Sequence, residues 1–541
     1  MYDLLLTNAV VITMDEKRRV IENGAVGVKD GRIAFVGDSM EAEQFEAKEV
    51  LDCKDHVVMP GFVDAHGHGG HSAFKSIVDL TSYWMPVMTH TYKNYITDDF
   101  WYNEGRLSAL ERLHAGVTTG VCVLGSQPRC DSPVPAFNNA RAYAEVGVKD
   151  IVCTGPCHVP WPHRFSRYTE DGERHMSQVS YETVLESLET VVSELNHANS
   201  DRTRAYVAPF GAVTSVDPSA PTSADRCVKL TEHDLQQARD MRRIAEKYNT
   251  RIHTDAFGGM VHLAYQDKEN ALLGPDVHLQ HCTGLSFDEA LIIQKTDTHI
   301  SVAPGMRQLV NRTPVIELLE LGVTVALTTD GSMLTSGFDM FDAMKRAQMI
   351  FRRAMNDDYY LPAEKVLEMT TIDAARCVGL DEEIGSLETG KRADIIAIDL
   401  MNPRLMPRIN LIETLIGNGH PSDVDLVVVD GEIRLRDGKA VGINEREILL
   451  KAEEEALETA KRAKHLHPFA WPEKEHWGQT KIYFDEVRFD LDENRKDGGH
   501  YQEGREQCMG NSFPIQLIFP RNEGLWQGRF FVICSHGCAY F

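Results

Sequence analysis

The sequence predicts an α/β protein: a (β/α)8 barrel of the TIM type, joined to a small β-sandwich domain that both chain ends form. Two observations lead to this fold class. Apolar, strand-like runs recur through the middle of the chain at the spacing of a strand, a helix and two loops, and short strands with tight turns fill both ends. A repeated βα unit is typical of parallel strands, and about 300 residues of it suit a closed barrel.

The first β-rich block begins the chain. Apolar runs such as LLLTNAVVITM and GAVGVKDGRIAFVGD alternate with turns, and Asp30–Gly31 has the composition of a hairpin turn. A matching pattern returns in KRADIIAID and VDLVVVDGEIRLRDGKAV, where Asp430–Gly431 and Asp437–Gly438 are the expected turns. We therefore expect residues 1–59 and 365–443 to form one composite β-sandwich domain.

The barrel is expected between these blocks, in residues 60–364. Its strand-like runs are marked by His253, His281, Val302 and Asp330, which are 28, 21 and 28 residues apart, and helical patterns such as LTEHDLQQARDMRRIAEKY fill the gaps. An open doubly wound sheet is the alternative arrangement of the same units. No GxGxxG or GxxxxGK[ST] motif follows a strand, which weakens a nucleotide-binding interpretation.

The last part of the chain, residues 444–541, differs from both predicted domains. EREILLKAEEEALETAKRAKHL has the amphipathic spacing of a surface helix. Beyond HPFAWPEKEHW the sequence becomes irregular and fits no periodic pattern. We expect a C-terminal helix followed by an irregular extension.

Composition excludes several classes of partner. The hydrophobic fraction of 43% and the charged fraction of 25% are those of a globular protein. Acidic residues outnumber basic ones by 81 to 56, and the resulting net charge of −25 repels nucleic acid and anionic membranes. No run of 18 apolar residues predicts a membrane span. The start of the chain has no basic n-region, and the 11 cysteines are scattered, as in a cytoplasmic protein with reduced thiols.

The first candidate metal-binding residues lie in the segment VVMPGFVDAHGH. His66 and His68 end an apolar run, and on a strand positions i and i+2 point to the same side, so both imidazoles can reach one ion. Two polar residues in a glycine loop are the ordinary alternative for this pair alone.

Three more polar residues end other candidate strands. His253 follows TRI, His281 follows DVHLQ, and Asp330 follows VTVALTT. The carboxyl ends of barrel strands converge on one face, where active sites lie. Histidines and a carboxylate with an open position for water suit a catalytic divalent metal. Each residue alone also fits a hydrogen-bonded group at a strand end, but the joint pattern favours a metal site.

The sequence resembles the amidohydrolase superfamily, and within it the triazine hydrolase and aromatic deaminase branch. The resemblance covers nearly all of residues 1–440. It is carried by VVMPGFVDAHGH, LSALERLHAGVTTGVCV, RIHTDA, VHLQHC, TTDGS and TTIDAARCVGLDEEIGSLETGKRADIIAID. It implies a metal-binding barrel flanked by a small β-sandwich from both chain ends, which agrees with the split β-rich blocks.

By position, the resemblance implies that His66, His68, His253 and Asp330 bind one divalent metal. It assigns His281 to polarising the substrate or stabilising the developing oxyanion. Asp330 would also take the proton of the metal-activated water and pass it to the leaving group. Members with two metals carry a lysine on the fourth strand, and AYVAPFGAV has none. Zinc is the first choice of metal, and cobalt, iron and manganese also fit this ligand set.

One departure from the family pattern concerns the segment after His253. Deaminases of this branch place a glutamate three residues beyond this histidine, whereas here that position holds Ala256. Asp255, two residues beyond, is the candidate replacement, with a surface carboxylate as the alternative. In its HGHGGH segment and in the absence of this glutamate, the sequence resembles the phenylurea and thiocarbamate (molinate) hydrolase subgroup.

Candidate substrate contacts lie around the predicted metal site. They are His71, Trp84, Asp255, Met306 and Arg307. The ordinary alternatives are a plain loop position for His71 and core packing for Trp84.

These observations favour a metal-dependent hydrolase that cleaves a carbonyl C–N or C–S bond in a small amide-, urea- or (thio)carbamate-type molecule, as in xenobiotic degradation. The alternative is a deaminase or dechlorinase of a nitrogen heterocycle of the triazine, purine or pyrimidine type. A catalytically inactive binding protein on the same barrel is the third hypothesis, and the complete set of metal-ligand positions argues against it. The resemblance further implies a homo-oligomer, a dimer or higher.

Overall fold

The computed structural model of the chain covers most of residues 1–463. The residues that it describes are 1–76, 84–125, 129–169, 171–213, 230–269, 271–305, 308, 312–332 and 337–463. Within these ranges, no helix is long and apolar enough to cross a membrane. The described residues end at Ala463, so the predicted irregular extension beyond HPFAWPEKEHW lies outside them.

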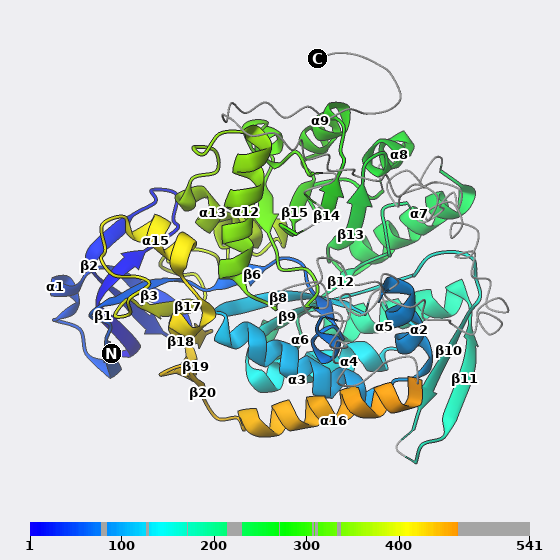
Figure 1. Cartoon of the computed structure of the whole chain (residues 1–541), viewed down its shortest axis with the longest axis horizontal. Helices are drawn as coiled ribbons and strands as arrows, with labels where there is room; N and C mark the ends of the chain where they lie inside the picture. The colour runs from blue at the N-terminus through cyan, green and yellow to red at the C-terminus, as the bar shows by residue number, and fades with distance from the viewer. Residues whose placement is uncertain are drawn as a thin grey trace, which may run out of the picture.

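A barrel of parallel strands occupies the centre of the molecule (Figure 1). Its strands, in chain order, are β6 (Phe62–Asp64), β7 (His68–Gly69), β8 (Val117–Leu124), β9 (Lys149–Thr154), β12 (Thr203–Val207), β13 (Ile252–Phe257), β14 (Val277–Thr283), β15 (His299–Val302) and β16 (Val325–Leu327). β6 and β7 both pair with β8 and share one position, so the described strands fill the eight positions of the predicted barrel. This confirms the predicted fold class.

The barrel closes through a short contact between the segments that follow its first and last strands, which we call the seam. Gly67 forms a parallel bridge with Asp330, and the Asp330 N–H donates to the His66 carbonyl (3.1 Å). The Thr329 N–H donates instead to a side chain, Asp64 Oδ1, at 3.0 Å. The seam therefore fixes the segments that carry His66 and Asp330 against each other.

Helices connect the strands and cover the outside of the barrel (Figure 1). The helices of this part of the chain are α2 (Trp84–Asn94), α3 (Asp98–His114), α4 (Val134–Val146), α5 (Tyr181–Leu195), α6 (Ala198–Asp201), α7 (Glu232–Lys247), α8 (Met260–Gln266), α9 (Phe287–Thr296), α11 (Val315–Glu320), α12 (Met340–Met355), α13 (Ala363–Met369) and α14 (Ile372–Cys377). α3 begins after Thr97, whose Oγ1 accepts the Phe100 N–H (3.0 Å), and Asp98 and Asp99 in its first turn complement the helix dipole.

Strands from both chain ends form a second, nine-stranded sheet beside the barrel, and Figure 1 shows the blue N-terminal strands next to the yellow β17 and β18. The N-terminal strands are β1 (Tyr2–Ile12), β2 (Val20–Lys29), β3 (Arg32–Asp38), β4 (Ala47–Asp52) and β5 (His56–Pro60), with α1 (Ser39–Ala42) between them. The other end supplies β17 (Ile395–Asp399), β18 (Val424–Val429), β19 (Glu432–Arg436) and β20 (Lys439–Ala440), with α15 (Leu411–Asn418) after β17. β5 and β17 pair antiparallel and thereby join the two ends.

The predicted hairpin turns of this sheet are present. Asp30–Gly31, Asp430–Gly431 and Asp437–Gly438 each join antiparallel strands, and all six residues have φ between 51° and 77°. Positive φ at both central residues is the geometry of a type I′ turn, which matches the twist of the flanking strands. Aspartate and glycine tolerate this conformation better than other residues do.

The sheet has two buried faces, because alternate residues of β17 belong to different apolar clusters. Ile395 and Ala397 pack with residues of β1 and β2, whereas Ile396 and Ile398 join the large cluster of the barrel. One face thus forms a core between strands of the two chain ends, and the other attaches them to the barrel. The exact domain boundaries stay a prediction.

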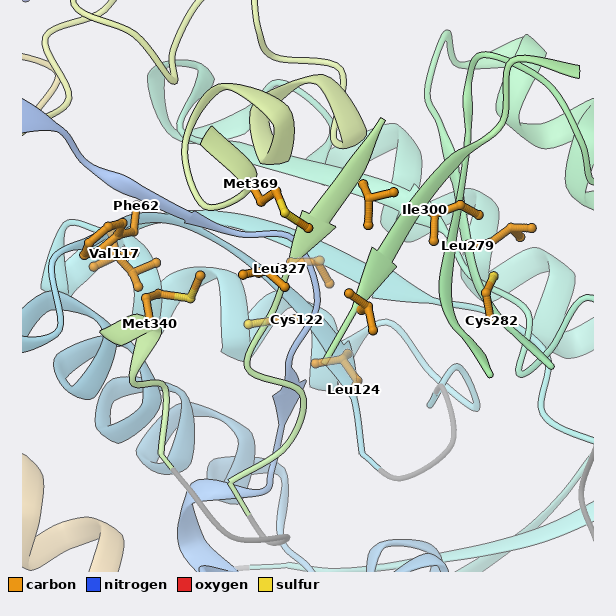
Figure 2. Packing of buried hydrophobic residues seen from close by; sticks show 14 of the residues in the cluster. Phe62, Val117, Cys122, Leu124, Leu279, Cys282, Ile300, Leu327, Met340 and Met369 are labelled. Atoms are coloured by element: carbon orange, nitrogen blue, oxygen red, sulfur yellow. The ribbon is translucent and has the colours of Figure 1, made fainter. Parts of the chain in front are cut away.

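Buried apolar side chains fill the space between the barrel strands and the helices (Figure 2). Leu279, Ile300 and Leu327 come from β14, β15 and β16 and belong to one cluster with Met369 of α13. Dense packing of this kind holds the carboxyl ends of the strands in fixed positions.

Two elements lie outside the barrel and the nine-stranded sheet. The first is an antiparallel pair, β10 (His163–Tyr168) and β11 (Arg174–Val179). The second is α16 (Glu445–Ala463), the predicted C-terminal helix, which runs beneath α3 in Figure 1. Arg462 ties this helix to the barrel side by donating to the Tyr95 carbonyl (2.8 Å).

Candidate active site

The five residues predicted to form the centre of the site lie together, although His253 is the second residue of β13 and does not end this strand as predicted. His66 and His68 come from the segment of β6 and β7, His253 from β13 and His281 from β14, and Asp330 follows β16. Nitrogens of His66 and His281 and an oxygen of Asp330 lie within 4.8 Å of one another. The structure therefore brings residues up to 264 positions apart in the sequence into one cluster.

The Asp330 carboxylate is at the centre of this cluster. Its Oδ1 lies 3.2 Å from His68 Nε2 and 3.6 Å from His66 Nε2. Its Oδ2 lies 4.0 Å from His281 Nε2. Since all four side chains are buried or nearly so, the carboxylate can interact with the three rings without competition from bulk water.

Backbone carbonyls set the orientation of two of the rings. His68 Nδ1 lies 2.8 Å from the Gly125 carbonyl, and His253 Nδ1 lies 3.1 Å from the His278 carbonyl. A carbonyl can only accept, so each Nδ1 carries a proton. Nε2 of the neutral His253 keeps a lone pair, whereas Nε2 of His68 faces the Asp330 carboxylate at 3.2 Å. The lone pair of His253 Nε2 lies 2.8 Å from His66 Nδ1. Ring nitrogens held in this way by a partner on their other side are typical of metal-ligating histidines.

The electrostatics of the cluster favour an ionised Asp330, a neutral His253 and a His68 that pairs with the Asp330 carboxylate. Burial alone would raise the pKa of Asp330, but the interactions with His66, His68 and His281 hold that pKa well below its usual range. Burial also opposes the charged form of His68, yet the Asp330 carboxylate outweighs this effect and raises the pKa of His68. Burial, together with neighbouring His66, lowers the pKa of His253 well below its ordinary value, so this ring is neutral.

The backbone at two of these positions is strained. His281 has φ of 69° and Asp330 has φ of 64°, in the left-handed region that side chains other than glycine rarely adopt. Such a conformation costs on the order of 1–3 kcal/mol per residue and persists where the surroundings impose it, commonly at functional sites. In Asp330 the seam with His66 supplies this constraint.

Asp255 faces the same cluster from β13. It follows His253 by two residues, so both side chains point to the same side of the strand. Asp255 Oδ2 lies 3.8 Å from His281 Nε2, and about a quarter of the side chain (24%) is exposed. Ala256, in the position where the resemblance places a glutamate in deaminases, is buried in the apolar cluster.

The structure describes the other residues predicted to contact substrate to different extents. His71 is buried, and its ring stacks on that of His68. Trp84 begins α2, but its side chain lies outside the described part of the chain. Met306 and Arg307 lie wholly outside the described residues. Contacts of these residues with substrate stay predictions.

Sequence reasoning missed a buried ion pair beneath the site. Arg112 Nη2 of α3 donates to Asp64 Oδ2 at 2.7 Å, and neither side chain is exposed. The same carboxylate accepts from Thr329 Oγ1 (2.8 Å), next to Asp330. The position of Asp64 two residues before His66 was the available signal, whereas nothing in the sequence pointed to Arg112.

The chain matches a known protein family. A model described as the amidohydrolase family matches residues 57–434, well over half of the chain. The chain belongs to the amidohydrolase family. This confirms the predicted hydrolase class, and the match covers the barrel together with strands of the nine-stranded sheet.

Curated relatives of this amidohydrolase cover most of the chain. A 5-methylthioadenosine/S-adenosylhomocysteine deaminase of Syntrophobacter fumaroxidans is 28% identical over 461 residues, which are 83% of this chain and 96% of the relative. A 5'-deoxyadenosine deaminase of Methanosarcina mazei is 25% identical over 470 residues, which are 85% of this chain and 99% of the relative.

Solved structures with the same fold include two enzymes. An adenosine deaminase from Xanthomonas campestris with bound zinc has a TM-score of 0.70 at 19% identity, and the match covers 85% of this chain and 99% of the deaminase chain. A triazine hydrolase from Arthrobacter aurescens has a TM-score of 0.71 at 19% identity, and the match covers 84% of this chain and 100% of the hydrolase chain. These similarities establish the fold, and the predicted molinate hydrolase subgroup stays a prediction.

Proposed function

We propose that this amidohydrolase removes an amino group, or an equivalent leaving group such as chloride, from a nitrogen heterocycle by metal-dependent hydrolysis. The observation that carries this proposal is a second carboxylate, Asp255, beside His281 and separate from Asp330. Attack of water on a ring carbon places charge on the adjacent ring nitrogen, so the reaction needs one group to take a proton and another to give one. The deaminase names of the curated relatives support the same class of reaction.

The residues present fit one divalent metal. His66 Nε2 is buried, has no hydrogen-bond partner among the described residues, and lies 3.6 Å from Asp330 Oδ1. Together with the imidazoles of His68 and His253 and the ionised Asp330, it would make the imidazole and carboxylate donor set that zinc prefers, and that cobalt, iron or manganese also accept. β12 contains no lysine, which agrees with the predicted single metal. A metal bound there supplies the Lewis acidity that makes water nucleophilic near neutral pH.

The protein side chains then divide the proton transfers. Asp330 is ionised, so it accepts the proton of the attacking water and returns it to the departing group. His281 Nε2 lies between the two carboxylates, at 4.0 Å from Asp330 Oδ2 and 3.8 Å from Asp255 Oδ2, where it orients the attacking oxygen. Asp255 is partly exposed and, in this scheme, protonates the ring nitrogen.

Hydrolysis of a carbonyl C–N or C–S bond is the second candidate function. Ala256 favours it, because this residue stands where the resemblance expects the proton-shuttling glutamate of deaminases. Attack on an amide, urea or thiocarbamate needs no ring protonation, and Asp330 alone can serve the leaving group.

Metal analysis and product analysis test the proposal. We expect the purified protein to contain about one metal per chain, to release ammonia from aminated purines or triazines or chloride from chlorinated triazines, and to lose this activity in Asp330→Asn. Release of an amine from ureas or thiocarbamates, without ammonia or chloride from any heterocycle, would move the assignment to the second candidate. A protein that holds no metal and hydrolyses neither group contradicts both.

The remaining predictions about the cellular context concern a small-molecule substrate, a homo-oligomer, a cytoplasmic location and xenobiotic degradation. They stay predictions, to be checked by sedimentation for the oligomer and by the substrate screen for the others.

A further inference from the structure

The His71 ring packs directly against the predicted metal site, although the residue is not one of the predicted ligands. Its ring is nearly parallel to that of His68, with centroids 4.4 Å apart and an angle of 11° between the planes. His71 is 1% exposed, so the stack is closed off from solvent. A flat ring at this distance blocks movement of His68 toward that side.

Gly331 provides the space that this ring occupies. A Cβ atom at residue 331 would lie 1.9 Å from His71 Nδ1, far inside contact distance. The Gly331 N–H also donates to Asp330 Oδ1 at 2.7 Å. His71 therefore lies between His68 on one side and the backbone that orients Asp330 on the other.

Two buried side chains hold the segment that carries His71. The Ser72 N–H donates to Glu104 Oε1 of α3 at 2.9 Å. On the other side of His71, the Gly70 carbonyl accepts from the Tyr92 hydroxyl of α2, also at 2.9 Å. Glu104 and Tyr92 are both buried, so they fix this short segment to two helices.

The His68 ring donates from Nδ1 to the Gly125 carbonyl (2.8 Å), and its Nε2 faces Asp330 Oδ1 at 3.2 Å. Both contacts lie at ring nitrogens, so neither prevents the ring from tilting about the line that joins them. The parallel ring of His71 removes this freedom. Pre-orientation of a ligand by its outer neighbours is worth about 10–100-fold in metal affinity.

We propose that His71 is a positioning residue that holds the metal ligand His68 in its binding orientation, and that Glu104 acts through it. The inference rests on the proposed metal-dependent function. His71, the third histidine of HGHGGH, thereby has a role that requires no contact with substrate.

Metal retention in two substitutions of His71 tests this role. The loaded proteins are titrated with a chelator, and the bound metal is measured by elemental analysis at each step. We expect His71→Ala to weaken metal binding by about 10–100-fold, whereas His71→Phe, which keeps a flat ring, stays within about threefold of the wild type. Circular dichroism shows whether each variant is folded.

Gly331→Ala supplies an independent test in the same assay. In the wild-type background the new methyl group displaces the His71 ring, so metal binding falls. In the His71→Ala background the methyl group has room, and no further loss is expected. This non-additivity would not arise if the two positions affected stability separately.

The outcomes separate this inference from the proposed function. A wild-type protein that binds no metal overturns the proposed function. A wild-type protein that binds metal, with His71→Ala binding it equally well, overturns the positioning role and leaves the function standing. A folded His71→Phe that loses metal as severely as His71→Ala also overturns the stacking argument, because the imidazole and not the flat ring is then required.

Discussion

Asp255 and Asp330 are both carboxylates near His281, yet their surroundings give them different chemistry. Asp330 is buried among histidines, which hold its pKa well below the usual range. Asp255 has one histidine neighbour, at 3.8 Å, and contact with solvent. In the proposed reaction the ionised Asp330 is the ligand and proton acceptor, and Asp255 is the proton donor. Pairs of carboxylates in unlike environments are how enzymes separate acid from base roles.

This division predicts the effect of Asp255→Asn at the level of the single residue. The substitution removes the proton donor but none of the predicted ligands, so kcat should fall by about 10²–10⁴-fold while the metal content stays unchanged. Steady-state kinetics with the best heterocyclic substrate and elemental analysis of the same preparation measure both. Asp330→Asn serves as the contrast, because it should lose metal and activity together. Unchanged kcat in Asp255→Asn would remove this residue from the mechanism and favour carbonyl C–N hydrolysis.

Glu104 leads to a second prediction at this scale. Burial raises its pKa to about 7, although the amides of Gly70 and Ser72 favour the charged form. The folded state therefore binds a proton that the unfolded chain releases near pH 4.5, and the free energy of unfolding falls by about 3 kcal/mol as the pH rises from about 4.5 to 7.

Glu104→Gln should remove this dependence, because the amide keeps an acceptor for Ser72 but cannot ionise. Urea unfolding measured between pH 4.5 and 8 should show a shallower decline for the variant. The wild type and the variant will still share the contribution of Asp150, whose pKa burial also raises to about 7. Parallel pH profiles for the two proteins would show that Glu104 does not titrate in this range.

At the scale of elements, α3 connects the loops that carry the site. Glu104 holds Ser72, and Glu111, two turns later, accepts the Phe338 N–H (3.2 Å) and pairs with Lys75 (2.8 Å). Arg112, on the same helix, is buried and pairs with Asp64. One helix therefore contacts the segments after both the first and the last barrel strands, on either side of the seam.

The buried Arg112–Asp64 pair predicts a large cost for Asp64→Asn. Removing one charge leaves the guanidinium buried without its partner, which costs about 3–5 kcal/mol. Arg112→Gln should cost a similar amount, and the double variant should cost less than the sum of the two, because neither charge is then left alone. Urea unfolding of the four proteins measures this cycle. Strict additivity would show that the pair does not hold the seam.

The strands that carry the site were the most predictable elements. The apolar runs of β13, β14 and β16 were predicted as neighbouring parallel strands; His253 and His281 lie within β13 and β14, and Asp330 follows β16. The β10–β11 pair was not predicted, because β11 is largely exposed and has no alternating apolar pattern. The stack of His71 on His68 was also beyond the sequence, because it depends on the absence of a side chain at Gly331.

At the scale of the whole molecule, a buried charge cluster joins the barrel to the nine-stranded sheet. Lys149 of β9 lies 2.8 Å from Asp394, which directly precedes β17, and 2.7 Å from Asp430, in the turn after β18. Arg392 and Arg202 contact Asp430 as well. The sequence showed that both ends of the chain form β structure, but not where that structure attaches, because these partners are up to 281 residues apart.

This cluster predicts that acid weakens the attachment of the sheet. Burial would raise the pKa of Asp430, but Lys149 and Arg392 outweigh it and lower that pKa to about 2. The stabilisation of about 2 kcal/mol is therefore present above about pH 4 and is lost as the pH falls toward 2. Lys149→Gln should unfold at a higher pH than the wild type in an acid titration followed by circular dichroism, since two buried carboxylates then lack their ammonium partner. Lys451→Gln is the matched control, because its exposed pair with Glu454 contributes little. If both variants unfold at the wild-type pH, the cluster does not govern the attachment.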